Sequence, residues 1–162
     1  YEEYIYRKNE KYPFYWDEWV RKAEAKPVPG AVAFMDSVRS LGKFAHIVFI
    51  TNRDTSQEAA TIANLKKYGM WKEGDVMLCR RNKKDVKESR RREVMNGTGR
   101  CEGLGKRTII ALFGDQLHDM VQYTKGTPPQ QLKEKYYEAN EWGTQWFVLP
   151  NPMYGPWRRG YK

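Results

Sequence analysis

The chain has 162 residues, of which 40% are hydrophobic, so it is suited to one globular domain and is not a disordered protein. It contains no apolar run of the roughly 18 residues that a membrane-spanning helix needs, and it begins with Tyr1 rather than Met, so we expect that an N-terminal segment has been removed. The net charge of +9 favours anionic partners such as nucleic acids, membrane surfaces or phosphorylated substrates.

The N-terminal part of the chain predicts one helix and a turn. Residues 1–15 are rich in tyrosine and charge, and a proline interrupts them. Apolar residues then recur at helical spacing from Trp16 to Ala23. The sequence Pro-Val-Pro-Gly at 27–30 is typical of a turn, so the helix is expected to end before it.

Helices and strands alternate along the rest of the chain. We expect strands over residues 45–50, 76–79, 108–113 and 146–149, and helices over residues 31–41, 87–95 and 132–139 and between Arg53 and Gly69. The glycine-rich stretch 96–106 is expected to form a surface loop. This alternation predicts an α/β fold with a mainly parallel sheet, in which ligands bind at the carboxyl ends of the strands.

The strand over residues 45–50 is followed by a hydroxyl residue, Thr51, and then by Asn52 and Arg53. The Thr51 hydroxyl can bind a phosphate oxygen. We expect the backbone amides of Asn52 and Arg53 to lie at the start of a helix, where such amides bind anions. A Thr-Asn turn is also a common structural feature without a ligand, and this alternative stays open.

Two aspartates follow the strand over residues 108–113. Asp115 and Asp119 lie one helical turn apart at the expected junction of this strand with a helix. Carboxylates suit Mg²⁺, which keeps several waters and takes one or two protein carboxylates. The alternative is that Asp115 caps the helix and that Asp119 is an ordinary surface residue.

A basic cluster lies between the second and third expected strands and accounts for much of the net charge. Its members are Arg80, Arg81, Lys83, Lys84, Lys87, Arg90, Arg91 and Arg92. Lys87 could supply a fixed cation that balances phosphate and aspartate charge. The alternatives are a solvated helix face and a nucleic-acid-binding surface, although no recognised nucleic-acid motif accompanies the charge.

The cysteines and histidines do not suggest another chemistry. Cys79 and Cys101 are too few for a disulfide framework, and whether they pair stays open. The sequence has no Cys/His cluster with zinc-ligand spacing. His46 and His118 have no serine or cysteine partner in an obvious motif, which argues against a Ser-His-Asp mechanism.

The order of these features is a strand ending in threonine, then a lysine, then a strand ending in Gly-Asp-x-x-x-Asp. This order resembles motifs two, three and four of the haloacid dehalogenase (HAD) superfamily, and the details resemble its bacterial class C acid phosphatases. The stretches that carry the resemblance are Pro27–Val32, Val48–Arg53, Lys87–Arg91, Gly114–Asp115 and Leu149–Gly155. The resemblance extends from about Trp16 to Trp157 and implies a Rossmann-like HAD fold with a small N-terminal helical cap.

The resemblance implies a phosphate-binding role for three residues. Thr51 would bind the transferring phosphoryl group with help from the Asn52 amide. Lys87 would be the motif-three lysine, which steadies the nucleophile and the phosphate, with Lys84 as the alternate.

The resemblance also implies a metal site and a substrate contact. Asp115 would be a Mg²⁺ ligand, and Asp119 would hold metal-bound water or its neighbours. Tyr154 would lie at the mouth of the site and stack on an aromatic or nucleobase leaving group. Trp16 and Trp19 would belong to the cap, and packing in the core is the favoured alternative for both.

One motif of the family is absent from the chain. The family begins with a strand ending in Asp-x-Asp-x-Thr, whose first aspartate attacks phosphorus and whose second is the general acid/base. Here the first aspartate is Asp17, within the expected tryptophan helix. Removing that central strand would leave unpaired backbone on its neighbours. We therefore expect that the natural protein is longer, that residues 1–162 form a single domain without its first strand, and that residues 1–28 form the cap segment.

The resemblance implies a Mg²⁺-dependent acid phosphatase that hydrolyses phosphomonoesters, nucleoside monophosphates among them, through a phospho-aspartyl intermediate. The chain by itself is expected to be inactive. Export to the periplasm or outer membrane, a lipid anchor and a homodimer are also implied. The alternative is a non-catalytic relative that binds a phosphorylated ligand or has a structural role. A basic nucleic-acid-binding protein is the less favoured third interpretation.

Overall fold

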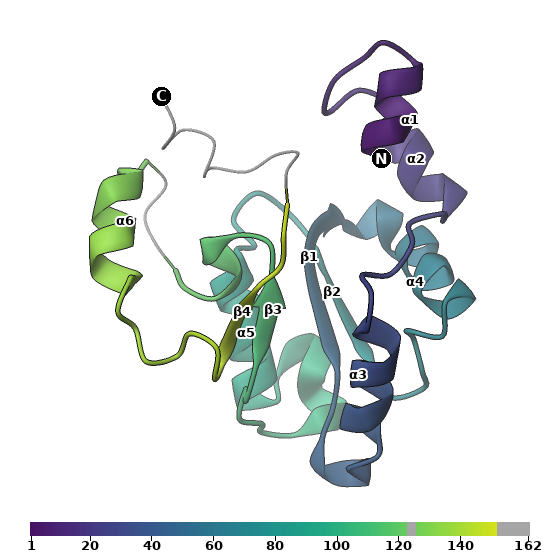
Figure 1. Cartoon of the computed structure of the whole chain (residues 1–162). Coiled ribbons are helices and arrows are strands. Elements are labelled where there is room, and N and C mark those ends of the chain that lie inside the picture. Colours follow the sequence, from purple (N-terminus) through teal and green to yellow (C-terminus); the bar gives the residue numbers. More distant parts are fainter. Residues whose placement is uncertain (123–125, 152–162) are drawn as a thin grey trace.

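Two pairs of parallel strands form the centre of the protein in the computed structural model, which describes residues 1–122 and 126–151 (Figure 1). Strand β1 (Val48–Asp54) pairs with β2 (Val76–Arg80), and β3 (Leu112–Gly114) pairs with β4 (Trp146–Val148). Both pairings are parallel, as the sequence predicted. Strand β3 is shorter than the strand expected over residues 108–113.

Helices surround these strands, which confirms the expected α/β class. Within the described residues they are α1 (Glu2–Arg7), α2 (Trp16–Lys22), α3 (Ala31–Arg39), α4 (Glu58–Lys67), α5 (Lys87–Asn96) and α6 (Pro129–Tyr136). Short 3₁₀ turns occur at Gly42–Phe44, Thr55–Gln57, Gly99–Leu104 and Leu117–Asp119. Figure 1 shows α3 and α4 on one side of the strands and α6 on the other. None of the helices in the described ranges is long and apolar enough to span a membrane.

The main core lies where β2, α5 and the 3₁₀ segment Gly99–Leu104 meet. Its buried members are Leu78, Val94 and Cys101. The expectation that residues 96–106 form only a surface loop is therefore wrong. The cause is the side chain of Cys101, which enters the core, while Arg100 donates a hydrogen bond to the Cys79 carbonyl at 2.7 Å.

Both cysteines are free thiols, which answers the question that the sequence left open. Each is fully buried. Burial raises the pKa of the Cys79 thiol to about 11, so this thiol stays protonated at neutral pH. The cysteines therefore act as small apolar core residues.

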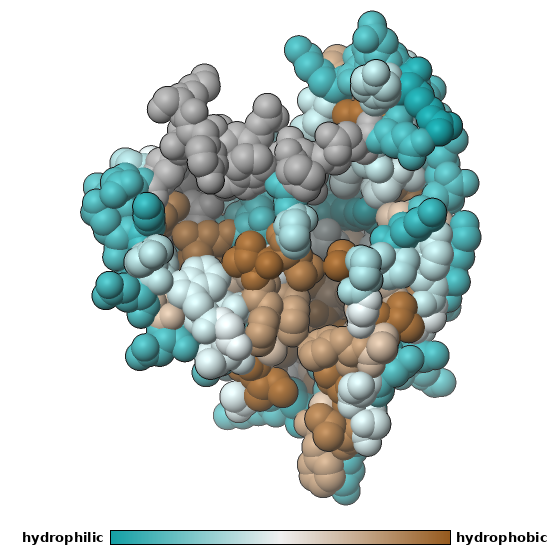
Figure 2. All heavy atoms as spheres, viewed as in Figure 1, coloured by the Kyte–Doolittle hydropathy of each residue, from teal (hydrophilic) through white to brown (hydrophobic). Residues whose placement is uncertain are grey.

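The two strand pairs do not join into one sheet within the described part of the chain. Strand β1 pairs with β2 alone and β3 pairs with β4 alone, so each pair has an open edge. Near β3, Ile110 is 67% exposed and Phe113 is 45% exposed. Phe113 contacts Phe34 of α3 with ring centroids 4.9 Å apart. Hydrophobic residues gather at the centre of the face shown in Figure 2.

The N-terminal segment docks on α4 and on the end of β1. The side-chain amide of Asn64 bonds both the N–H and the carbonyl of Ala25, each at 2.8 Å. The Arg53 guanidinium lies over the rings of Trp16 and Trp19, at 5.5 and 5.7 Å from their centroids. Helix α2 agrees with the predicted tryptophan helix, whereas α1 was not predicted from the tyrosine-rich start of the chain.

The Asn64 amide anchors this segment, so its removal is expected to destabilise the fold. In Asn64→Ala, two part-buried backbone groups of Ala25 lose their partners, at a cost of about 1–3 kcal/mol. Urea denaturation measures the free energy of unfolding. The control is Lys66→Ala, because Lys66 is an exposed residue of the same helix. Equal stability of the two variants would contradict the anchoring role.

Candidate functional site

The Thr51-Asn52-Arg53 segment belongs to a strand rather than to the start of a helix. Strand β1 continues to Asp54, with an irregularity in its pairing between Thr51 and Asp54. The expectation that the Asn52 and Arg53 amides lie at the start of a helix is therefore wrong. The cause is continued pairing with β2, supported by an ion pair between Asp54 and Arg80 at 3.1 Å. The Arg53 amide donates instead to the Thr51 hydroxyl at 3.3 Å.

A fully buried arginine holds the end of β1 in place. The Arg90 side chain has 0% exposure and donates to the Thr51 carbonyl at 2.5 Å and to the Asn52 side-chain oxygen at 2.6 Å. It also donates to the carbonyls of Leu78 and Asp85 at 3.1 and 3.2 Å. Arg90 thereby fixes the orientation of Asn52 and joins β1, β2 and the start of α5.

The same helix contacts the aspartate loop that follows β3. Lys87, one turn before Arg90, forms an ion pair with the Asp119 carboxylate, and both side chains are largely buried. Arg91 donates to the Asp119 carbonyl at 2.7 Å. Lys87 and Asp119 thus meet although they are 32 positions apart in the sequence.

Asp119 shapes the aspartate loop. Its second carboxylate oxygen accepts hydrogen bonds from the amides of Asp115 and Gln116 at 3.0 and 3.1 Å. The N-cap of this turn is Gln116, in a capping box with Asp119, so the alternative of an Asp115 cap with Asp119 as a surface acid is wrong. Burial opposes ionisation of Asp119, but Lys87 outweighs it and holds the pKa of Asp119 below its ordinary value. Gly114 is required because a Cβ there would collide with the Asp119 side chain.

Asp115 has the opposite electrostatic environment. Burial, together with the nearby charge of Asp119, raises the pKa of Asp115 above its ordinary value, although the Asn151 amide donates a hydrogen bond to one of its oxygens. A cation beside Asp115 would relieve this cost. Within the described ranges no group of three His, Cys, Asp or Glu side chains could hold a metal ion. Mg²⁺ takes one or two protein carboxylates and keeps water ligands, so the buried Asp115 carboxylate fits such an ion.

Several members of the basic cluster have structural roles within the protein. Arg90 and Arg91 are buried, so a solvated helix face is the wrong interpretation for them. Arg81 bonds the buried Asp85 at 3.0 Å and Glu93 at 2.9 Å. These arginine side chains are paired with carboxylates of the same protein, which argues against a nucleic-acid-binding surface.

Three functional positions differ in how well the sequence located them. Arg90 was counted in the basic cluster and in the Lys87–Arg91 stretch of the resemblance but was given no role of its own. Asn151 was part of the family resemblance but was given no role. Tyr154 lies outside the described residues, so its predicted place at the mouth of the site stays a prediction.

Comparison with known proteins assigns this arrangement to a family. Residues 1–157 match the family model described as HAD superfamily, subfamily IIIB (Acid phosphatase). Among solved structures, the class C acid phosphatase from Bacillus anthracis with tungstate bound is similar to this chain, with a TM-score of 0.74 and 31% sequence identity. The match covers 93% of this chain and 60% of the Bacillus anthracis chain. A second structure of that protein has a TM-score of 0.72 and 30% sequence identity. Its match covers 93% of this chain and 59% of the Bacillus anthracis chain.

Two soybean (Glycine max) proteins are also similar. The stem 31 kDa glycoprotein is 29% identical over 159 residues, which are 95% of this chain and 52% of that protein. The stem 28 kDa glycoprotein is 29% identical over 142 residues, which are 86% of this chain and 47% of that protein. The chain thus spans about half the length of these relatives.

Loss of Arg90 is expected to destabilise the protein strongly. Arg90→Met removes one of the cationic partners of the buried Asp85 carboxylate, at 3.3 Å, while Arg81 and Arg100 remain. It also removes the donors to the Thr51-Asn52 segment. We expect a loss of about 3–5 kcal/mol in the free energy of unfolding, measured by urea titration. The control is Arg92→Met on the same helix, because the Arg92 side chain is 64% exposed. A similar small loss in both variants would refute the structural role.

Asp115→Asn is expected to stabilise the fold at neutral pH. The folded pKa of Asp115 is raised by burial, so its ionised form costs stability above that pKa, and the cost disappears as the pH falls below the unfolded value. The gain over the natural chain is therefore full above the folded pKa of Asp115 and disappears well below the unfolded value of 3.8. Unfolding titrations across this range measure it, with Asp36→Asn as the control at an exposed aspartate. A gain that does not change with pH would contradict this account.

Proposed function

Because the chain belongs to subfamily IIIB of the HAD superfamily, the acid phosphatases, we propose that the natural protein is a Mg²⁺-dependent acid phosphatase. It hydrolyses phosphomonoesters, with nucleoside monophosphates among the candidate substrates. The observation that carries this proposal is the role of α5. Its Arg90 holds the Thr51-Asn52 segment and its Lys87 holds Asp119, so threonine, lysine and aspartate side chains gather around one edge of the strands.

Each residue has a defined role in this proposal. Thr51 and Asn52 bind oxygens of the phosphoryl group. Lys87 supplies positive charge that is already fixed in place by Asp119, which avoids reorganisation as charge develops on the phosphoryl oxygens. When bound, Mg²⁺ polarises the phosphoryl group. Asp115 would hold it directly and Asp119 through water.

We also propose that a further strand of the natural protein supplies the nucleophile. The open edges of β1 and β3 and the exposed apolar residues Ile110 and Phe113 support this. The limited share of each relative that the chain covers agrees with it. The strand would carry the aspartate that forms the phospho-aspartyl intermediate and the aspartate that acts as general acid/base. Residues 1–162 are then an inactive, incomplete domain, with residues 1–28 as its cap.

Location and assembly are proposals from family resemblance alone. They are export to the periplasm or outer membrane through a lipid anchor, and a homodimer. The alternative function is a non-catalytic protein that binds a phosphorylated ligand, which the same residues would support without a nucleophile.

Activity of the natural full-length protein is the decisive measurement. We expect Mg²⁺-dependent hydrolysis of a phosphomonoester, with kcat/KM lowered at least about a hundredfold in Thr51→Ala and in Lys87→Met. The control is Lys84→Met, because Lys84 is exposed and lies close to Lys87 in the sequence. The chain of residues 1–162 should bind inorganic phosphate without turnover.

Three outcomes would change this view. Turnover by residues 1–162 alone would refute the missing nucleophile. Phosphate binding by a full-length protein with no turnover would favour the non-catalytic alternative. Loss of activity in Lys84→Met but not in Lys87→Met would transfer the phosphate-binding role to Lys84.

A further inference from the structure

The end of β1 contains an insertion next to Thr51, for which we propose phosphate binding. Thr51 and Asp54 pair with consecutive residues of β2. The two residues between them, Asn52 and Arg53, are therefore extra relative to β2 and form a bulge. Bulges interrupt strand pairing and redirect side chains, so the position of this segment depends on the groups that hold Asn52 and Arg53.

Three helices hold these two residues. Helix α5 binds the side-chain oxygen of Asn52 through Arg90, at 2.6 Å. The Arg53 guanidinium extends instead to α4, where it donates a hydrogen bond to the Thr61 hydroxyl at 3.0 Å. It also lies over the two tryptophan rings of α2. Arg53 therefore joins β1 to the N-terminal segment and to the helix on which that segment docks.

The aromatic surface beneath the Arg53 guanidinium belongs to the N-terminal segment. The rings of Trp16 and Trp19 lie 5.5 Å apart, and Tyr1 packs edge-on against both, with centroids 5.0 and 5.5 Å away. Arg53 is only partly exposed, and removal of water strengthens the attraction between a cation and aromatic rings. The contact between the guanidinium and this aromatic surface therefore depends on the docked position of the N-terminal segment.

Buried hydrogen bonds fix the helices around this contact. Thr61, which accepts the hydrogen bond from Arg53, donates to the Gln57 carbonyl at 2.8 Å, and both Thr61 and Gln57 are buried. The Gln57 side-chain amide in turn donates to the carboxylate of Asp17 in α2. Helices α2 and α4 therefore hold the Arg53 side chain as one connected unit.

Arg53 also contacts Thr51 through its backbone. Its amide donates to the Thr51 hydroxyl at 3.3 Å. The side chain of Arg53 thus contacts the N-terminal segment, while its backbone contacts the hydroxyl that we propose to bind phosphate. Displacement of α2 from β1 would release the guanidinium, and the Thr51 hydroxyl would then lose its fixed orientation.

We propose that Arg53 is a positioning residue, which couples docking of the N-terminal segment on β1 to phosphate binding at Thr51 and Asn52. The proposal rests on the proposed function, because that function assigns the phosphoryl oxygens to those two residues. Arg53 acts through Trp16 and Trp19 and needs no contact with the substrate. Because such coupling is reciprocal, bound phosphate should also tighten the contact between α2 and β1.

Affinity for inorganic phosphate, measured on the chain of residues 1–162, is the first test. Arg53→Met should weaken binding at least about fivefold, and the double tryptophan variant, with Trp16→Leu and Trp19→Leu, should do the same. The triple variant should bind no more weakly than the weaker of these two, because all of the changes break one contact. Arg53→Lys keeps a cation over the rings, so its affinity should lie between those of Arg53→Met and the natural chain.

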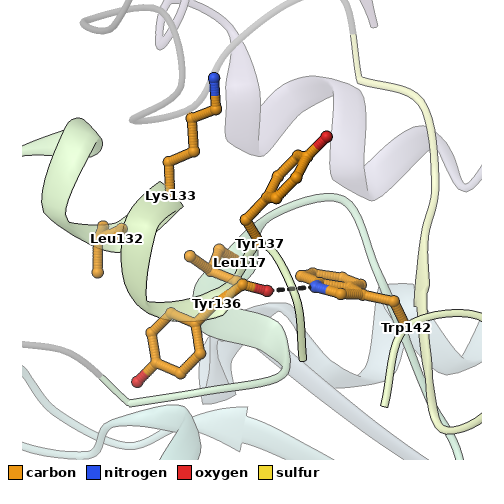
Figure 3. A pocket seen from close by; sticks show the side chains of 6 residues that line it. All are labelled: Leu117, Leu132, Lys133, Tyr136, Tyr137 and Trp142. Carbon is orange, nitrogen blue, oxygen red and sulfur yellow. Dashed lines mark hydrogen bonds between the residues drawn. The ribbon is translucent and has the colours of Figure 1, made fainter. Parts of the chain in front are cut away.

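The matched control is another cation over an aromatic ring. The Lys133 ammonium lies 5.9 Å from the centre of the Tyr137 ring. Both residues line the cavity beside α6 that Figure 3 shows, on the other side of the strands from α4. Lys133→Met removes the same kind of interaction and should leave the affinity for phosphate unchanged.

Nuclear magnetic resonance tests the coupling separately from the affinity. The backbone amide signals of Thr51 and Asn52 should shift in the double tryptophan variant without any ligand, and they should not shift in Lys133→Met. Saturating phosphate should shift the indole N–H signals of the two α2 tryptophans in the natural chain but not in Arg53→Met. A purely stabilising role of Arg53 would not abolish this response in the folded variant. If the double variant does not fold, Trp19→Phe keeps a ring and gives the same comparison with a smaller effect.

The outcomes separate this proposal from the proposed function. Equal phosphate affinity in Arg53→Met and in the natural chain overturns the positioning role and leaves the phosphate site intact. Weak binding in Arg53→Met together with natural affinity in the double tryptophan variant means that Arg53 acts without the N-terminal segment, which also overturns the proposal. If phosphate binds to none of the chains while the Thr51 and Asn52 amide signals still shift in the double tryptophan variant, the link through Arg53 stands and the proposed function fails.

Discussion

The buried guanidinium of Arg90 must be neutralised and hydrogen-bonded, and this constraint determines how the residues of the site are arranged. Arg90 is fully enclosed, so its charge needs a partner and its N–H groups need acceptors. Asp85 supplies the charge, and the acceptors come from the ends of β1 and β2. The backbone at Thr51 must therefore lie where Arg90 can reach it. A stabilising interaction of the core thus sets the position of the Thr51-Asn52 segment, for which we propose phosphate binding.

Helix α5 extends this constraint to the second half of the site. Lys87 and Arg91 flank Arg90 and bond the carboxylate and the carbonyl of Asp119. The charges of Lys87 and Asp119 cancel each other, which leaves Asp115 as the carboxylate with an unfavourable, desolvated charge. Lys87 and Asp119 therefore neutralise each other, and the carboxylate of Asp115 is left suited to a cation. This division explains why two aspartates so close in sequence have pKa values shifted in opposite directions.

The sequence predicted the elements better than it predicted their ends. The apolar runs gave the strands and the α/β class, because apolar periodicity depends on local residues alone. It missed the extension of β1 through Asn52 and Arg53, which depends on pairing with β2 and on the Asp54–Arg80 ion pair. It also missed the burial of Arg90, since a basic run gives no sign of which members find acidic partners. Thr51, Lys87 and the two aspartates were located because the family motifs fix them by order and spacing.

The open edges of the two strand pairs connect the fold to the proposed chemistry. In a parallel arrangement, a strand added to β1 or β3 would end at the same edge as Thr51 and Asp115. Its last residues would then lie next to the residues for which we propose phosphate and metal binding, which is where the proposed mechanism needs an attacking carboxylate.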